Sequence, residues 1–161
     1  MSAANDLALV SLRPMLETDL PAIMEIELRC YEFPWSEKIY RDCLMVGYGC
    51  WVVEYAQKVV GYGIMSAAAG EAHILNICIS ETYRRDGLGR HLFNHLVRLA
   101  EDHHVSSIFL EVRESNLGAY RLYEQEGFID VGTRKNYYPA KEGREDAIIM
   151  AKELIIRDEK E

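Results

Sequence analysis

The chain has 161 residues, 49% of them hydrophobic and 27% charged, a composition typical of one soluble globular domain. Its 26 acidic and 18 basic side chains give a formal net charge of -8, which argues against direct nucleic-acid binding because phosphate contacts need a basic surface. No apolar run approaches the roughly 18 residues that cross a bilayer, and the first ten residues lack signal-peptide features. We therefore expect a cytoplasmic protein without a membrane partner.

The first half of the chain predicts a strand, two helices and three more strands. The first strand ends at Pro14, and Thr18 or Asp19 is the expected N-cap of the helix that follows. Ser36 is the expected N-cap of the second helix. The three strands form a meander, because the gap at residues 56–58 is of hairpin length. The predicted elements are 7–14, 17–31, 33–45, 50–55, 59–67 and 71–80.

The second half predicts a helix, a strand, a second helix and two strands. Leucines recur every three or four residues from Leu88 to Leu99, which indicates an amphipathic helix. The next strand is almost continuously apolar, as expected for a strand buried on both faces. Gly127 follows the last helix, where a left-handed cap is favoured. The predicted elements are 88–103, 106–112, 116–126, 128–138 and 145–154. We expect an α/β domain with one mixed sheet and helices on both faces.

A glycine-rich loop precedes the helix that begins near residue 88. It contains Arg84, Arg85, Asp86, Gly87, Leu88, Gly89 and Arg90. The first N–H groups of a helix have no internal partner, so glycines and arginines there favour a bound anion such as pyrophosphate. The loop fits neither the Walker pattern nor the Rossmann pattern. Alternatively, the glycines form only a tight strand-to-helix turn.

Two motifs together resemble the GNAT N-acetyltransferase family. Residues 84–89 match its acyl-coenzyme A signature, Arg/Gln-x-x-Gly-x-Gly/Ala. A second family pattern is carried by Asn116, Ala119, Leu122, Tyr123, Gly127 and Phe128. Four further segments resemble the RimI type of the family, the bacterial ribosomal-protein-alanine N-acetyltransferases. These segments are 33–38, 110–116, 136–139 and 143–150.

The resemblance implies a GNAT fold with a central sheet of about six to seven strands, in a single domain over residues 1–161 with a flexible tail from about residue 155. It also implies acetyl-CoA as acetyl donor and a ribosomal protein as substrate. Residues 84–90 would bind the pyrophosphate, and the backbone of Ile77, Cys78 and Ile79 would bind the pantetheine arm. Asn116 resembles a further cofactor contact, although a plain helix N-cap is an alternative. The oligomeric state stays open.

Glu111 and Tyr123 are the candidate catalytic residues. Glu111 interrupts an apolar strand, where a carboxylate is costly unless it is used or paired. The resemblance implies that Glu111 is the general base, and the alternative is a structural ion pair with Arg113 or another cation. Tyr123 would protonate the leaving thiolate; the alternatives are a core role for its ring and Tyr120 as the acid.

The acceptor site is expected among aromatic side chains. Phe33, Trp35, Tyr137 and Tyr138, together with Pro34, resemble the walls of a pocket for a peptide N-terminus, although clustered aromatics are often core. The acids Glu32, Glu145 and Asp146 would attract a basic segment, or they form a solvated rim.

The cysteines and histidines do not predict a metal site. The four cysteines lack metal-type spacing, so we expect reduced and mostly buried thiols. His91 and His95 are spaced four residues apart on a helix, but no third ligand accompanies them. Two other functions remain open: a GNAT enzyme for a small amine or other protein N-termini, and a non-catalytic acyl-CoA-binding module.

Overall fold

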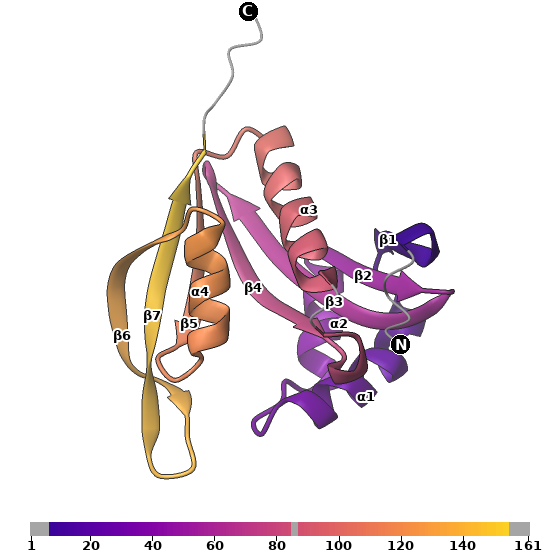
Figure 1. Ribbon diagram of the computed structural model, residues 1–161, viewed down its shortest axis with the longest axis horizontal. Helices are drawn as coiled ribbons and strands as arrows, with labels where there is room; N and C mark the ends of the chain where they lie inside the picture. The colour runs from indigo at the N-terminus through magenta and orange to yellow at the C-terminus, as the bar shows by residue number, and fades with distance from the viewer. Residues whose placement is uncertain (1–6, 85–86, 155–161) are drawn as a thin grey trace, which may run out of the picture. The chain divides into compact units, whose positions relative to one another are not determined.

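A computed structural model describes residues 7–84 and 87–154 of the chain (Figure 1). It confirms the mixed α/β prediction, with a seven-stranded sheet in the order β1-β2-β3-β4-β5-β7-β6. The strands are β1 (Val10–Pro14), β2 (Gly49–Tyr55), β3 (Lys58–Ala68), β4 (Glu71–Ile79), β5 (Ser107–Arg113), β6 (Ile129–Pro139) and β7 (Arg144–Glu153). The α-helices are α1 (Leu20–Cys30), α2 (Glu37–Met45), α3 (Leu88–Asp102) and α4 (Leu117–Gln125).

The chain divides into two compact units. The first contains Met1–Ser66 and Leu75–Val97, and the second contains Ala67–Ile74 and Arg98–Glu161. Strand β4 and helix α3 each pass from one unit to the other. The single-domain expectation stays a prediction, and the tail expected from about residue 155 lies outside the described residues.

In the first unit, α1 and α2 pack against the antiparallel strands β2 and β3. Their shared core contains Leu20 and Ile23 from α1, Tyr40 from α2, and Val52 and Ile64 from the two strands. The start of α3 is packed closely on β3. A Cβ added at Gly63 would lie 3.2 to 3.3 Å from side-chain atoms of Ile77, Leu92 and Leu96, so only glycine fits comfortably there.

In the second unit, β5 lies between β4 and β7. Residues Glu71–Ile74 of β4 pair in parallel with Ser107–Leu110 of β5, and β5 and β6 each pair antiparallel with β7. Helix α4 runs alongside these strands (Figure 1). Side chains along β5 alternate between buried and half-buried, so the prediction of a strand buried on both faces was wrong.

The predicted helix ends were partly right. Ser36 caps α2 by accepting a hydrogen bond from the Ile39 N–H, and Gly127 follows α4 with a φ of +94°. Asp19 occupies the N-cap position of α1, as one of the two predicted candidates, but its side chain makes no capping hydrogen bond. The carboxylate of Asp19 instead pairs with Arg13 at 2.8 Å, because that arginine on β1 offers a stronger, charged donor.

Candidate active site

The predicted anion site lies at the start of α3 in the first unit. Gly87 has a φ of +81° and its carbonyl accepts the His91 N–H at 3.0 Å, so the glycine sits at the turn that starts the helix. A Cβ at Gly87 would meet nothing within 4 Å, and Gly87 itself is exposed. Arg84 is exposed, and its Nε donates to the Ile79 carbonyl at 3.0 Å. Arg90 is also exposed, and Leu88 is buried beneath the turn.

This arrangement fits a phosphate-bearing cofactor, because an exposed helix start lies beside exposed arginines. Gly89 is half-buried and lies close to Ile79 of β4. Arg85 and Asp86, which were also predicted to contact the cofactor, lie outside the described residues.

The predicted pantetheine segment is the last part of β4. The carbonyl of Ile77 accepts a hydrogen bond from the Tyr31 hydroxyl at 3.2 Å. The carbonyl of Ile79 accepts one from Nε of Arg84. Burial raises the pKa of the Cys78 thiol to about 12. Cys78 is therefore a neutral, buried thiol, and the predicted contact with the cofactor concerns its backbone.

Glu111, the predicted base, lies in the second unit with only 7% of its side chain exposed. Its Oε2 contacts Nε2 of His73 on β4, and its Oε1 lies 3.3 Å from Nε of Arg134 on β6. Glu111 thus has an ion-pair partner in Arg134, and its role as the base stays a prediction. Arg113 pairs with Glu145 at 3.0 Å.

Sequence reasoning missed His73 and Arg134 as neighbours of Glu111. His73 pairs with Phe109 in the parallel β4–β5 ladder, two residues before Glu111. Arg134 pairs with Ala147 on β7, which itself lies opposite Arg113 of β5. Both contacts depend on strand register, for which the sequence contains no local signal.

Tyr138 lies within electrostatic reach of both candidate catalytic residues. Its pKa is raised, first by burial and then by Tyr137 and Glu111, with a smaller contribution from Tyr123. The Arg113 guanidinium lies 4.5 Å from the centre of the Tyr138 ring. The second unit therefore contains the predicted base, the predicted acid and two predicted acceptor residues, Tyr137 and Tyr138.

Tyr123 occupies α4 and packs against Phe128, with 6.3 Å between the ring centres. Burial raises the pKa of Tyr123 to about 12, so its hydroxyl keeps its proton at neutral pH. Tyr120 lies on the same helix and is half-buried. Asn116 is the N-cap of α4, since its side chain accepts the Ala119 N–H at 3.2 Å.

The segment that holds Tyr137 and Tyr138 bulges from the β6–β7 ladder. The register shifts between Arg134 and Tyr138, and Asn136 adopts a φ of +54°. Asp146 accepts the Asn136 N–H at 2.8 Å, and Arg144 donates to the carbonyls of Asn136 and Tyr137. These contacts hold the tyrosine pair in place.

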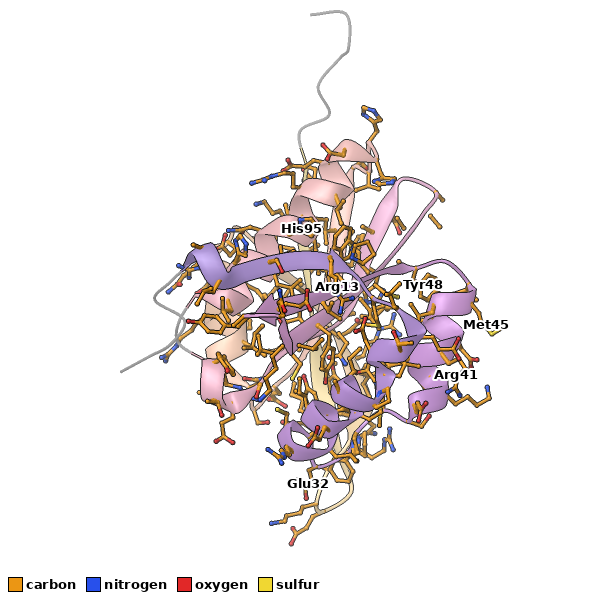
Figure 2. All side chains as sticks on the ribbon, turned by 90° about the vertical axis from the view of Figure 1, so that its right-hand side faces the viewer. Arg13, Glu32, Arg41, Met45, Tyr48 and His95 are labelled. Atoms are coloured by element: carbon orange, nitrogen blue, oxygen red, sulfur yellow. The ribbon has the colours of Figure 1, made fainter. Side chains whose placement is uncertain are left out.

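The predicted acidic residues differ in their surroundings. Glu145 accepts hydrogen bonds from the Ser115 N–H and from Arg113, and these bonds lower its pKa. Asp146 holds the bulge at Asn136. Glu32 is exposed on the loop between α1 and α2 (Figure 2). Of the three acids, Glu32 is therefore the one most accessible to a basic segment.

Phe33 and Trp35 belong to that same loop in the first unit. Phe33 is 38% exposed, whereas Trp35 is half-buried with its ring 5.3 Å from the Tyr40 ring. The backbone N–H of Trp35 donates a hydrogen bond to Oε2 of Glu27 at 2.8 Å. Glu27 was not predicted from the sequence, although its position four residues after Ile23 on an apolar helix face was an available signal.

Other predicted features concern metals, thiols and membranes. All four cysteines are free, three of them buried and Cys30 half-buried. Residues 7–84 and 87–154 hold no group of three metal-ligating side chains. Within the same residues, no helix combines the length and the apolar character needed to cross a membrane.

Comparison with known proteins agrees with the two motifs. Residues 20–128 match the Acetyltransferase (GNAT) family. The [ribosomal protein bS18]-alanine N-acetyltransferase of Escherichia coli strain K12 is 43% identical over 134 residues, which cover 83% of this chain and 90% of that protein. The enzyme of the same name from Haemophilus influenzae is 35% identical over 134 residues, or 83% of this chain and 91% of that protein.

The fold also agrees with a solved structure. The crystal structure of the ribosomal-protein-S18-alanine N-acetyltransferase from Escherichia coli superposes with a TM-score of 0.87 and 39% identity, covering 93% of this chain and 97% of the other. The sheet order, the glycine turn before α3 and these likenesses together show that the chain belongs to the GNAT family of acetyltransferases.

Proposed function

We propose that this chain transfers the acetyl group of acetyl-CoA to the N-terminal alanine α-amine of ribosomal protein bS18. The observation that carries the proposal is the 43% identity to the Escherichia coli enzyme of that name, along 90% of that enzyme's length. We further propose that the protein acts in the cytoplasm as one domain. The acetyltransferase chemistry follows from membership of the GNAT family, and the identity of the substrate is inferred from the names of the relatives.

Acetyl-CoA, when bound, supplies the thioester carbonyl that the amine attacks and the sulfur that leaves. The open turn at Gly87, with Gly89 and the exposed Arg84 and Arg90, would hold its pyrophosphate. The backbone at Ile77–Ile79 and the side chain of Asn116 would contact the rest of the cofactor. Arg85 and Asp86 complete the proposed set from the sequence motif.

Glu111 would accept the proton that the amine loses. A protein α-amine has a pKa near 8 and lysine has one near 10.4, so the neutral amine at pH 7 costs about 1.4 and about 4.6 kcal/mol respectively. A carboxylate acting directly or through a water molecule is sufficient for the α-amine. His73 and Arg134 would orient the carboxylate of Glu111 for this role.

Tyr123 would supply the proton that the departing sulfur needs. Its raised pKa keeps the hydroxyl protonated until that proton is required. After the reaction, Glu111 holds one extra proton and Tyr123 lacks one, so a proton transfer through solvent restores both residues.

The aromatic side chains Phe33, Trp35, Tyr137 and Tyr138 would contact the N-terminal residues of the acceptor. Phe33 and Tyr137 are both exposed, which suits a role in binding.

Intact-mass measurement of acetyl transfer tests this proposal. The acceptor would be a peptide with the N-terminal segment of bS18, beside a lysine-containing peptide whose N-terminus is blocked. We expect one acetyl group on the α-amine and none on lysine. Replacement of the base in a Glu111→Gln variant should slow transfer about 100-fold or more.

The matched control is Glu114→Gln, which removes an exposed carboxylate three residues farther along the chain. It should keep the wild-type rate. No transfer to the bS18 peptide by a protein that binds acetyl-CoA would contradict the proposed substrate. Acetylation of a small polyamine or of unrelated N-termini instead would favour the broader alternative.

A further inference from the structure

Glu27 on α1 is a carboxylate buried in the core of the first unit. Only 1% of the residue is exposed. Oε1 accepts hydrogen bonds from the hydroxyls of Tyr40 at 2.6 Å and Tyr62 at 2.5 Å, and Oε2 accepts the Trp35 N–H at 2.8 Å. Among residues 7–84 and 87–154, the structure gives Glu27 no cationic partner.

A buried carboxylate is costly unless hydrogen bonds replace its lost hydration. Three short bonds do so here, and bonds to a charged acceptor are about twice as strong as neutral ones. Burial and the negative charge of Glu27 both raise the pKa of Tyr40 and Tyr62, so each hydroxyl remains a donor. The three side chains and the Trp35 backbone N–H therefore form one fixed hydrogen-bonded unit.

This network joins two segments that matter for acetyl transfer. The Trp35 N–H belongs to the six-residue loop between α1 and α2, which also holds Phe33. On the other side, Asn76 donates to the Tyr40 hydroxyl at 2.7 Å, and the Tyr31 hydroxyl donates to the Ile77 carbonyl at 3.2 Å. The loop and the last part of β4 are thus tied through Glu27 and its neighbours.

We propose that Glu27 is a positioning residue that fixes the α1–α2 loop as a rigid wall of the acceptor site. This inference rests on the proposed function, because it assigns the loop to peptide binding. Glu27 lies beneath the loop and does not touch the reacting atoms. Its role is to hold Trp35, and with it the exposed Phe33, at a set distance from the backbone of β4.

Glu27→Gln keeps the shape of the side chain but leaves a donor without an acceptor. If the amide oxygen serves the two tyrosines, the amide NH₂ faces the Trp35 N–H, and two donors repel. The reverse orientation removes the acceptor of both hydroxyls. The first orientation loses fewer bonds, so we expect the Trp35 contact to break and the loop to loosen.

The test combines steady-state kinetics with amide hydrogen exchange. In Glu27→Gln we expect the KM for the acceptor peptide to rise roughly tenfold to a hundredfold, the usual value of a hydrogen bond to a charged group. The KM for acetyl-CoA and the kcat at saturating peptide should change by less than about threefold. The Trp35 N–H, protected in the wild type, should exchange much faster in the variant.

Two control variants separate positioning from general destabilisation. Glu25→Gln makes the same chemical change on the exposed face of α1, where Glu25 pairs only with Arg29, and should leave every readout unchanged. Val53→Ala removes buried apolar contacts on β2 away from the network, so it should lower the melting temperature while the peptide KM stays at the wild-type value.

The outcomes distinguish this inference from the proposed function. A wild-type enzyme that does not acetylate the peptide contradicts the proposed function. An active wild type whose Glu27→Gln variant keeps its peptide KM overturns the positioning role alone. If Glu27→Gln does not fold, hydrogen exchange in the wild type still tests the positioning role. A backbone N–H of Trp35 that exchanges without protection would also overturn that role.

Discussion

Tyr123 shows how burial sets the protonation state of one side chain. A tyrosine hydroxyl with a pKa near 10 would begin to lose its proton in mildly alkaline solution. Burial raises the pKa of Tyr123 to about 12, so the hydroxyl stays protonated well beyond that range. Helix α4 positions the Tyr123 side chain, and the burial of its hydroxyl keeps that hydroxyl protonated.

Replacement of Tyr123 by phenylalanine should therefore lower kcat on the order of 100-fold, the usual contribution of a general acid. Because the hydroxyl is protonated throughout, the loss should be the same at every pH between about 6 and about 10. Stopped assays across that range, with acetyl-CoA affinity measured by calorimetry, would check both points.

Tyr120→Phe is the matched control on the same helix and should reduce kcat less than Tyr123→Phe. A larger loss in Tyr120→Phe would show that Tyr120 is the acid. A loss in Tyr123→Phe that disappears toward pH 10 would mean that the hydroxyl ionises normally, contrary to the effect of its burial.

At the level of elements, the turn before α3 depends on one backbone conformation. Gly87 adopts a φ of +81°, which costs a residue with a side chain about 1 to 2 kcal/mol. The space around it is open, so the restriction is conformational and not steric. The start of α3 therefore depends on the positive φ of Gly87. We expect the affinity of a ligand bound at the first N–H groups of α3 to depend on the same conformation.

Gly87→Ala should weaken acetyl-CoA binding about tenfold, which corresponds to about 1.4 kcal/mol of strain. Titration calorimetry would measure this change. Gly118→Ala in α4 is the control, since its added methyl also meets open space but the residue lies within a helix. That variant should keep the affinity and raise the melting temperature, because alanine favours the helix by about 1 kcal/mol. Unchanged affinity in Gly87→Ala would show that the turn does not shape the cofactor site.

The elements themselves were largely predictable from the sequence, but the contacts between them were not. Leucine spacing predicted α3, and Ser36 and Gly127 marked a helix start and a helix end because their effects are local. Asp19 lies at the predicted N-cap of α1, but its pairing with Arg13 was not predictable, since Arg13 reaches it only after β1 and α1 have packed. His73 and Arg134 beside Glu111 require the register of three strand pairs, which no short pattern in the sequence specifies.

At the scale of the whole molecule, we expect the excess of acidic side chains to affect association with the acceptor. The formal net charge of -8 creates a negative field that attracts a basic peptide and repels an acidic one. Glu32 on the α1–α2 loop contributes to this field as an exposed carboxylate beside Phe33. The attraction acts across water and is therefore sensitive to salt.

The KM for an acceptor peptide with several lysines after its N-terminal segment should rise with ionic strength. The screening length falls from about 10 Å at 0.1 M salt to about 3 Å at 1 M, so long-range attraction is lost over that range. A peptide with the same N-terminal residues but neutral side chains farther along should keep its KM. Glu32→Gln should reduce the salt dependence for the basic peptide and leave kcat unchanged. Equal salt responses of the two peptides would mean that the negative charge serves solubility and does not guide the acceptor.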